Sequence, residues 1–298
     1  MREVLRSNTV AEVTTALSRR DWRWVAEADL PSGVKAISDP PLGLFVRGNL
    51  EGGPGVAVVG ARRASAYGRE VAEHLGRELA RGGATVISGM ARGVDAAAHR
   101  GALSARGQTV AVWGSGPDIV YPAEHGALAE EIGASGALVS EYPPGTPPLA
   151  RHFPERNRLI AAMAQVIVVV EADEKSGALV TARLALDEGR EVMAVPGSIF
   201  SRLSAGPNGL LRAGAAPVVS AADVLEAVGL TTRRERGAGE PPPFLDHVPA
   251  GEAVSVDRVA AASGRPVAEV LDELVQLELN GWLVREADGR YRRTRLRA

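Results

Sequence analysis

The run Val56-Ala57-Val58-Val59-Gly60-Ala61-Arg62 decides the fold, because an uninterrupted apolar stretch ends there in a glycine-bearing corner. The residues that follow have helical spacing, with Val71, Leu75 and Leu79 on one stripe. A short run that is apolar throughout, rather than alternating, is typical of a strand covered on both faces. Such a strand followed by an amphipathic helix predicts one unit of an α/β fold.

The same alternation recurs along the chain. Further apolar runs, separated by helical stretches, occupy residues 84–88, 109–113, 137–139, 166–170, 191–195 and 217–219. Strands separated by helices pair in parallel, because each helical crossover brings the chain back to the end of the sheet where the previous strand began. We therefore predict a Rossmann-like, doubly wound and mainly parallel sheet over residues 41–230.

Smaller segments flank this predicted domain. Residues 1–40 show helical spacing, at Val10, Val13 and Leu17 and again around Trp24, and are predicted to form a short helical extension. Residues 231–243 hold arginines, glycines and three consecutive prolines, a composition that predicts a linker. Residues 244–298 follow the order helix, turn, helix and hairpin, which predicts a small winged helix-turn-helix domain.

Composition limits the classes of function. The formal charge of the 298-residue chain is −2, so a nucleic-acid surface has to be local. The absence of cysteine excludes disulfides, thiolate metal sites and a thiol nucleophile, and it suits a reducing compartment. The first ten residues lack the apolar core of a signal peptide, and no apolar stretch is long enough to cross a bilayer. These features predict a cytoplasmic protein without a membrane partner.

The glycine-bearing corners form the candidate binding site. Four of them follow predicted strands, and in a parallel sheet such corners meet beyond the carboxyl ends of the strands. Glycine lets a phosphate approach the backbone, and the helix that follows offers free N–H groups and a positive dipole end. Tight turns also explain glycines, but nearby cations favour an anion site. The candidate residues are Gly60, Arg62, Ser88, Gly89, Arg92, Gly93, Gly114, Gly116, Lys175, Ser176 and Gly177.

Known catalytic and cofactor motifs are missing from these corners. Gly114-Ser115-Gly116 is followed by Ile119 where a dinucleotide fingerprint has glycine or alanine, which argues against bound NAD. Lys175-Ser176-Gly177 lacks the upstream spacing of a Walker loop. The sequence also has neither a nucleophile-elbow motif nor paired histidines with metal spacing. We therefore predict no cofactor, no metal ion and no catalytic residue.

Two clusters each allow two interpretations. Asp95 and His99 lie one helical turn apart and form either an acid–base pair or, as we prefer, a helix-start aspartate near an ordinary histidine. The basic segment 151–158 contains Phe153, Arg156 and Arg158. Its ring and cations either meet single-stranded nucleic acid, or Phe153 anchors the loop in the core while the arginines cap a helix or pair with an acid.

The joint set of motifs resembles the DprA/Smf family. The matching stretches, in family order, are residues 56–62, 67–68, 88–95 with His99, 114–116, 121–122, 140–145, 153–158, 171–172, 175–177 and 195–197. The resemblance covers residues 40–230, approximately, and the tail is similar to the small winged-helix module of that family.

This resemblance implies a non-catalytic recombination mediator of natural transformation. Members of the family bind single-stranded DNA in the Rossmann-like domain, work as homodimers and help to load the recombinase RecA. Their DNA-binding positions correspond here to Arg62 and Lys175, with the Phe153 segment nearby. A rival prediction is a nucleotide-processing enzyme related to the phosphoribohydrolases, whose longer glycine-rich signature is reduced here to Pro196-Gly197-Ser198. A third prediction, a transcription regulator, rests on the tail alone.

The second helix of the tail, residues 266–280, is predicted to avoid DNA. We expect its apolar stripe to face the small core, which leaves its acids on the surface that a major groove would meet. The stripe is Val267, Val270, Leu271, Leu274 and Leu277, and the acids are Glu269, Asp272, Glu273 and Glu278, with no lysine or arginine among them. The basic residues lie instead on the wing and end, at Arg290, Arg292, Arg293, Arg295 and Arg297. The tail is therefore predicted to contact a protein partner, or at most to rest its wing on a DNA backbone.

Overall fold

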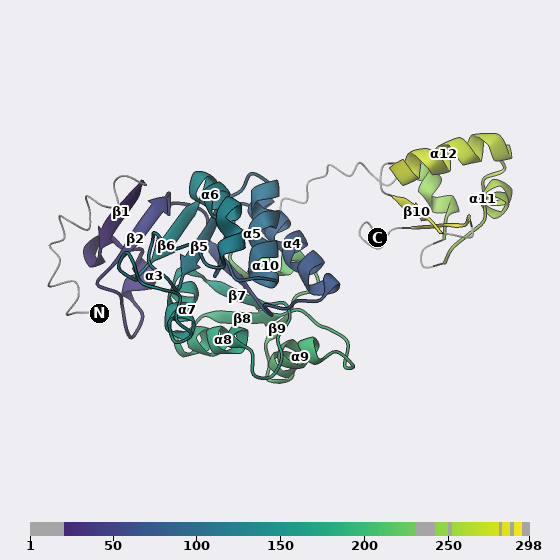
Figure 1. Ribbon diagram of the computed structural model, residues 1–298. Helices are drawn as coiled ribbons and strands as arrows, with labels where there is room; N and C mark the ends of the chain where they lie inside the picture. Colours follow the sequence, from purple (N-terminus) through teal and green to yellow (C-terminus); the bar gives the residue numbers. More distant parts are fainter. Residues whose placement is uncertain (1–20, 231–241, 250–251, 280–281, 287–288, 294–298) are drawn as a thin grey trace. The chain divides into compact units, whose positions relative to one another are not determined.

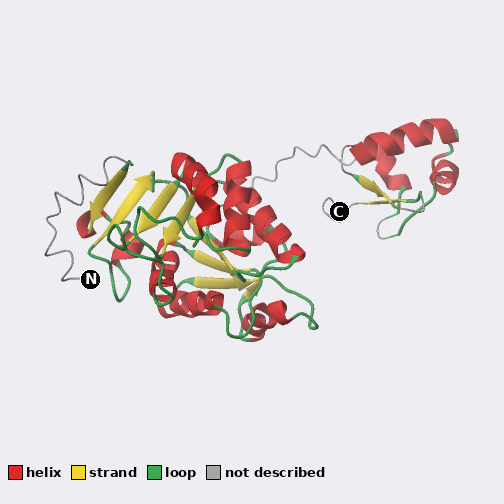
Figure 2. Ribbon diagram, in the orientation of Figure 1, coloured by secondary structure: helices red, strands yellow, loops and turns green. Residues whose placement is uncertain are grey.

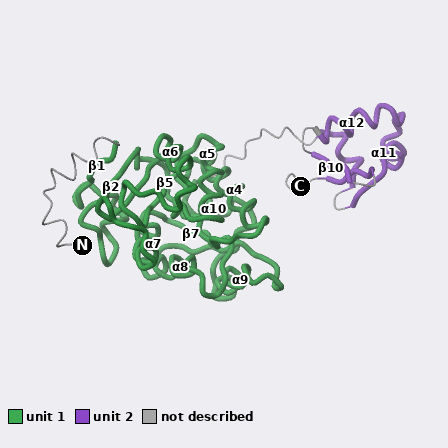
Figure 3. Tube along the Cα trace, in the orientation of Figure 1, with its two compact units in different colours: residues 1–232 green, residues 233–298 purple. Residues whose placement is uncertain are grey.

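The structure, a computed structural model, describes residues 21–230, 242–249, 252–279, 282–286 and 289–293 (Figure 1). Figure 2 shows its helices, strands and loops. The chain forms two compact units, residues 1–232 and 233–298, which Figure 3 distinguishes by colour. Among the described residues, no helix combines the length and apolar character that crossing a membrane requires. Most of the predicted linker and the first twenty residues of the predicted extension lie outside the described part.

A single nine-stranded sheet organises the larger unit, in the order β1-β2-β6-β5-β4-β3-β7-β8-β9. From β3 to β9 neighbouring strands pair in parallel, as predicted. Their bounds are β3 Gly55–Val59, β4 Thr85–Ser88, β5 Thr109–Trp113, β6 Ala137–Ser140, β7 Val166–Val169, β8 Glu191–Ala194 and β9 Ala216–Pro217. The strand order reverses between β3 and β7, because β4, β5 and β6 extend to one side of β3 and β7, β8 and β9 to the other.

Helices cover both faces of the sheet, because successive strand residues point to opposite faces. Val56 and Val58 of β3 pack in one buried cluster with α4, α5 and α10, whereas Ala57 and Val59 pack in another with α3, α7 and α8. The helices are α3 Ser32–Lys35, α4 Ala66–Arg81, α5 Val94–Ser104, α6 Gly126–Ser135, α7 His152–Met163, α8 Gly177–Asp187, α9 Ala205–Arg212 and α10 Ala221–Ala227. Short 3-10 turns η1, η2 and η3 occupy Glu27–Asp29, Ala123–His125 and Arg202–Ser204. The doubly wound, Rossmann-like architecture is confirmed.

The antiparallel edge of the sheet differs from the sequence prediction. Helical spacing placed Trp24 in an extension, but Trp22–Ala26 forms strand β1, which pairs with β2 at Gly43–Gly48. The aromatic side chains decide the outcome: Trp22 packs on Trp113 and Trp24 packs edge-on against Phe45, with ring centroids 5.5 and 4.7 Å apart. Such cross-strand and interstrand contacts outweigh a local helical pattern, so this part of the prediction was wrong.

The smaller unit has a core of its own, around Phe244, Val259, Leu274, Trp282 and Tyr291. It consists of η4 Pro243–His247, α11 Val256–Ser263, α12 Val267–Leu279 and the antiparallel strands β10 Leu283–Arg285 and β11 Tyr291–Arg293. This is the predicted order of helix, turn, helix and hairpin. The predicted apolar stripe of α12 is divided: Val270, Leu274 and Leu277 are buried, but Val267 and Leu271 are exposed. Because the core is small, it accepts only one side of that stripe.

Candidate functional site

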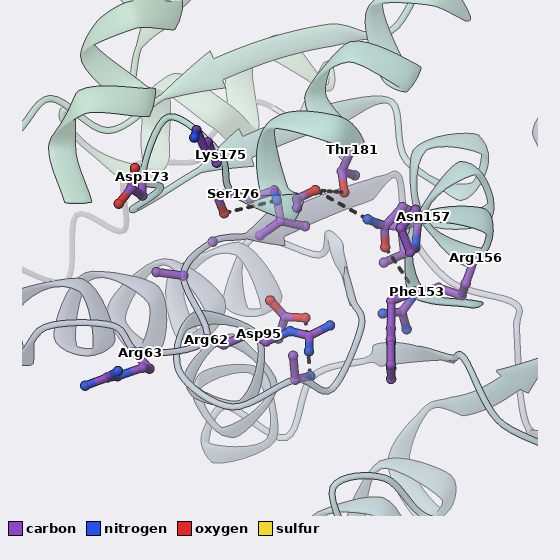
Figure 4. A pocket seen from close by; sticks show the side chains of 18 of the residues that line it. Arg62, Arg63, Asp95, Phe153, Arg156, Asn157, Asp173, Lys175, Ser176 and Thr181 are labelled. Atoms are coloured by element: carbon purple, nitrogen blue, oxygen red, sulfur yellow. Dashed lines mark hydrogen bonds between the residues drawn. The ribbon is translucent and has the colours of Figure 1, made fainter. Parts of the chain in front are cut away.

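A pocket of about 840 Å³ lies beyond the carboxyl ends of β3 and β7, where the strand order reverses. Open α/β sheets bind ligands at this switch point, because the loops on either side diverge and leave a crevice. Of the predicted site residues, the pocket is lined by Gly60, Arg62, Phe153, Arg156, Lys175, Ser176 and Gly177 (Figure 4). Three separate sequence segments therefore converge as predicted.

The corner after β3 is fixed by the buried carboxylate of Glu171. Its two oxygens accept hydrogen bonds from the backbone N–H and the hydroxyl of Ser65, at 2.9 and 2.5 Å. Ser65 in turn caps α4 by accepting from the N–H of Gly68. Between these fixed points Arg62 and Arg63 are exposed and line the pocket. Sequence reasoning overlooked Arg63, although it adjoins Arg62 in the same corner.

Phe153 lies half-buried at the start of α7, between a cation and a second ring. The Arg62 guanidinium carbon is 4.6 Å from the centre of the Phe153 ring, and the Tyr121 ring centre is 5.4 Å away. Gly114 lies so close that a Cβ there would be 3.1 Å from the Phe153 ring. Phe153 thus packs against the loop, as one interpretation expects, and also remains accessible at the pocket, as the other requires. Tyr121, which the sequence analysis did not select, is exposed beside it.

The start of α8 lines the same pocket with Ser176, Gly177 and Ala178. Ser176 caps this eleven-residue helix, and its hydroxyl accepts a hydrogen bond from the N–H of Ala178. Asn157 and Thr181 both donate to the carbonyl of Gly177, so three labelled side chains gather around this turn (Figure 4). Lys175 is exposed, and within the described residues it forms no ion pair or hydrogen bond. Arg202 lies nearby and pairs with Asp173 at 2.8 Å.

Arg156 differs from the other cations because its guanidinium is buried. It donates to the backbone carbonyls of Gly89 and Val112 and to the side-chain oxygen of Asn157. Burial lowers the pKa of Arg156 to about 10, while nearby Asp95 acts in the opposite direction, so the group is charged at neutral pH. A Cβ at position 89 would lie 2.5 Å from this guanidinium, which explains the glycine there. Arg156 therefore supports the pocket wall from inside.

The loop between β4 and α5 is held by Asp95. Its carboxylate accepts hydrogen bonds from the backbone N–H groups of Gly89 and Ala91, at 3.1 and 3.3 Å. Burial raises the pKa of Asp95 against the opposing charge of Arg156. Gly93 has a φ of +78° and closely approaches the carbonyl of Ala61, a position that only glycine fills without strain. Ser88 is buried and donates to the carbonyl of Val58.

Asp95 and His99 have separate partners. The Nδ1 of His99 is 2.7 Å from the hydroxyl of Thr109, which itself donates to the carbonyl of Val86. His99 Nδ1 is therefore the donor of this pair, and Nε2 carries no proton and has no partner among the described residues. Burial lowers the pKa of His99 to about 3, with His125 adding to the effect. The arrangement matches the preferred interpretation of an ordinary core histidine.

The remaining predicted residues lie outside the main pocket. Arg92 pairs with Glu124 and, with Gly89, lines a small hollow on the other side of Arg62 and Phe153. Arg158 is largely buried and pairs with Glu141 at 2.8 Å and with Asp39 at 3.2 Å. Gly114 packs against Phe153, and Gly116 packs against the carbonyl of Pro143. These residues shape the site or lie beside it rather than facing its opening.

The larger unit has a Rossmann-like fold with exposed cations in an open pocket at its switch point, and a winged-helix unit follows it in the chain. These features define a Rossmann-like protein with a candidate anion site. Residues 22–229 match the family model of DNA recombination-mediator protein A, and residues 245–289 match that of the DprA winged helix domain. The chain therefore belongs to the DNA recombination-mediator protein A family, which is the DprA/Smf family that its motifs resemble.

Individual relatives agree with this assignment. The DNA processing protein DprA of Bacillus subtilis is 40% identical over 205 residues, which are 68% of this chain and 69% of that protein. Protein Smf of Escherichia coli is 39% identical over 270 residues, or 85% of this chain and 72% of that protein. The X-ray structure of DNA processing protein A from Streptococcus pneumoniae superposes with a TM-score of 0.66 at 39% identity, covering 71% of this chain and 77% of that one.

A second solved structure comes from Helicobacter pylori. Its DNA processing protein A, which was studied for a unique single-stranded DNA binding mode, superposes with a TM-score of 0.64 at 30% identity. The match covers 70% of this chain and 95% of that one.

Proposed function

We propose that the pocket binds single-stranded DNA and that the protein acts as a recombination mediator of natural transformation. The observation that carries this proposal is the convergence of exposed Arg62, Arg63 and Lys175 on one pocket beside the rings of Phe153 and Tyr121. Cations meet the phosphates, and any base has a face that stacks on an aromatic ring, so this combination suits a strand of any sequence. The relative from Helicobacter pylori, with its single-stranded DNA binding mode, supports the same assignment.

Each element of the pocket has a distinct part in the proposed binding. Arg62, Arg63 and Lys175 contact phosphates, and the N–H of Gly177 at the start of α8 donates to a phosphate oxygen. Phe153 stacks on a base and orients Arg62 above its ring. Arg156 and Asp95 hold the loops and make no direct contact with the strand. Ser88, Gly89, Gly93, Gly114 and Gly116 shape the surrounding backbone, and Arg92 and Arg158 lie beside the path.

The family resemblance extends the proposal to partners. We propose that the protein works as a homodimer and helps to load RecA onto the bound strand, which places its activity in the cytoplasm. Binding of this kind protects a strand while leaving it unchanged, so we also propose that the protein is not an enzyme.

The rival function, nucleotide processing, needs an acid or base free to act in the pocket. Of the carboxylates that line the pocket, Asp95 already accepts two backbone hydrogen bonds and Asp173 pairs with Arg202, while Glu174 is exposed to solvent. Pro196-Gly197-Ser198 does not contribute to the lining of the pocket. Both observations favour binding without catalysis.

Two parallel measurements test the proposal. Fluorescently labelled oligo-dT is titrated with the protein, and nucleoside monophosphates are incubated with it and analysed for release of the free base. We expect salt-dependent binding of oligo-dT and no base release. Base release without oligo-dT binding would establish the rival function instead.

A further inference from the structure

The exposed aromatic side chains of the larger unit lie on the side of the sheet where the parallel strands end. All twelve aromatic residues of the chain are described, and those with exposed side chains are Tyr67, Tyr121 and Phe200. Tyr121 lines the pocket, and the hydroxyl of Tyr67 donates to the carbonyl of Pro196 in the loop that carries Phe200. Each of the three therefore lies beyond the carboxyl ends of the strands, on the side of the pocket.

Phe200 and its neighbour Ile199 are the most exposed large apolar residues that the structure describes, at 93% and 85% of their full area. The loop that presents them, residues 196–201, is nevertheless well fixed. Gly197 exchanges two hydrogen bonds with the side chain of Asn208, and Ser201 N–H donates to the carbonyl of Ser198. The Phe200 N–H donates to the Ser198 hydroxyl. A fixed loop that points two apolar side chains at water indicates a contact surface.

The loop is connected to the pocket by a cation. Arg202 follows Phe200 by two residues and lines the pocket, and its side chain is exposed while pairing with Asp173. The carbonyl of Leu203 accepts a hydrogen bond from the N–H of Ala172, which ties this segment to the corner after β7. Lys175 lies on that same corner without an ionic partner among the described residues. Lys175, Arg202 and Phe200 are thus exposed on two segments that this hydrogen bond joins.

We propose that Ile199, Phe200 and Tyr67 form a second stacking site for single-stranded DNA, which a strand reaches after leaving the pocket across Arg202. This inference rests on the proposed binding of single-stranded DNA in the pocket. Alternating cations and rings along one track are what a flexible polyanion with stackable bases needs. The Arg202 side chain is 87% exposed, and an ion pair this exposed contributes little, so a phosphate can replace Asp173 as the partner of the guanidinium.

A strand fits this surface better than a second copy of the chain does. Ile199 and Phe200 form a small apolar tip close to Arg202, whereas a stable interface between proteins buries roughly 800 Å² on each partner. The exposed Arg202 suits a polyanion, while two copies of the tip would bring two Arg202 side chains together. We therefore assign the surface to DNA, and self-association becomes an outcome of the test.

Oligonucleotide length separates the second site from the pocket. We compare Phe200→Ala with the unaltered full-length chain, using oligo-dT of about six residues to fill the pocket and of about fifteen to reach beyond it. Loss of one stacked base should weaken binding of the longer strand by about fivefold to a hundredfold. Binding of the shorter strand should not change. Leu186→Ala, which truncates a side chain that is 56% exposed on α8, is the matched control and should alter neither.

A second variant gives a direct signal. In Phe200→Trp the new ring keeps the stacking face, and its fluorescence should be quenched by the longer strand but not by the shorter one. The existing tryptophans are poor competitors for this signal, since Trp22, Trp113 and Trp282 are buried and Trp24 is half-buried.

The outcomes distinguish this inference from the proposed function. If the unaltered protein binds neither strand, the proposed function itself fails. If it binds both and Phe200→Ala binds both equally well, only the second site is refuted. If Phe200→Ala changes the mass measured by light scattering but not the affinity per protomer, the surface is an interface between copies and the assignment to DNA is wrong.

Discussion

The pocket of the larger unit and the smaller unit differ in whether their exposed cations have ionic partners. At the pocket of the larger unit, Arg63 and Lys175 are exposed without an ionic partner among the described residues, and Arg62 rests on a ring. In the smaller unit every described arginine is engaged. Arg258 pairs with Glu252, Arg265 with Glu269 and Glu273, and Arg292 with Glu286, while Arg293 donates to the carbonyls of Val248 and Leu245. Arg285 lies over Tyr291, and Arg290 also interacts.

We infer from this difference that unpaired charge, rather than the type of domain, marks the candidate nucleic-acid site. A winged helix is a common DNA-binding fold, yet the helix α12 that a groove would meet is acidic, with exposed Glu269 and Asp272. Its exposed Val267, Leu271 and Val275, four residues apart, instead suit contact with a protein. The aromatic residues follow the same division, because Phe244, Trp282 and Tyr291 of the smaller unit are all buried.

Removing the free cations of the pocket should have the largest effect. A hydrogen bond to a charged group is worth about 1.5–3 kcal/mol, so Arg62→Ala or Lys175→Ala should each weaken oligo-dT binding about ten- to hundredfold. The double variant should lose more than either single variant, though not necessarily the sum, because both side chains line one pocket. The slope of affinity against salt concentration should fall by about 0.7 for each lost phosphate contact.

Fluorescence anisotropy at several salt concentrations measures both quantities. Arg81→Ala is a suitable control, since this arginine is exposed at the far end of α4 and pairs with Glu78. A folded double variant with unchanged affinity and slope would exclude the pocket as the binding site.

Truncating the ring in the pocket should have the next largest effect. Phe153→Ala should cost about 1–3 kcal/mol of binding free energy through the lost base stacking, with only a small change in the salt slope. Phe153→Leu fills most of the same space but has no aromatic face, so it should also bind weakly while retaining the melting temperature. If Phe153→Ala instead lowers the melting temperature strongly and binds normally, the ring serves only to anchor the loop.

Acid should destabilise the larger unit through His99. The folded-state pKa of about 3 lies below the unfolded value of about 6.5, so between these values the unfolded chain binds a proton that the folded chain does not. The contribution of His99 to stability is complete above pH 6.5 and should fall by about 1.4 kcal/mol per pH unit below pH 6. Comparison with a variant that lacks the imidazole separates this effect from the other titrating groups.

Urea unfolding of the unaltered chain and of His99→Asn measures the contribution. The amide of asparagine can still donate to Thr109 but does not titrate, so the difference in unfolding free energy between the two should shrink or reverse as the pH falls. The raised pKa of Asp95 acts in the opposite direction and is common to both proteins. The charged neighbours Arg156 and Arg100 and the neighbouring His125 are retained as well. Parallel curves for the two proteins would refute this role. The smaller unit buries no histidine among its described residues and serves as an internal reference.

Removing the smaller unit should have the smallest effect on binding. Deleting residues 233–298 should leave the affinity for oligo-dT within about threefold, because the ion-paired arginines of the smaller unit are more covered than Arg202, with side chains 25–61% exposed against 87%. The separate tail should bind duplex DNA weakly and without sequence preference. Tight, sequence-selective duplex binding by the tail would show that pairing in the free unit does not prevent its arginines from reading DNA.

The sequence by itself determined the architecture of the larger unit. Strands covered on both faces and the helices between them have different hydrophobic periods, and these periods are visible in one chain without knowledge of its contacts. The corners after β3 and β7 were also predictable, because glycine and a capping serine reflect local backbone requirements. The convergence of Arg62 and Lys175 was predictable for a different reason. In a parallel sheet, the loops that follow the strands meet beyond the carboxyl ends of those strands.

Only the tertiary structure decided which cations are free. Arg62, Arg92, Arg156 and Arg158 are alike in sequence, yet Arg92 and Arg158 pair with acids and Arg156 bonds to the carbonyls of Gly89 and Val112, which are 67 and 44 residues away. The same limit applies to β1, whose strand conformation depends on pairing with β2. It applies also to Phe200, which is exposed because no other described segment of the larger unit packs over it. Burial and pairing are properties of segments brought together by the fold, and no local pattern in the chain encodes them.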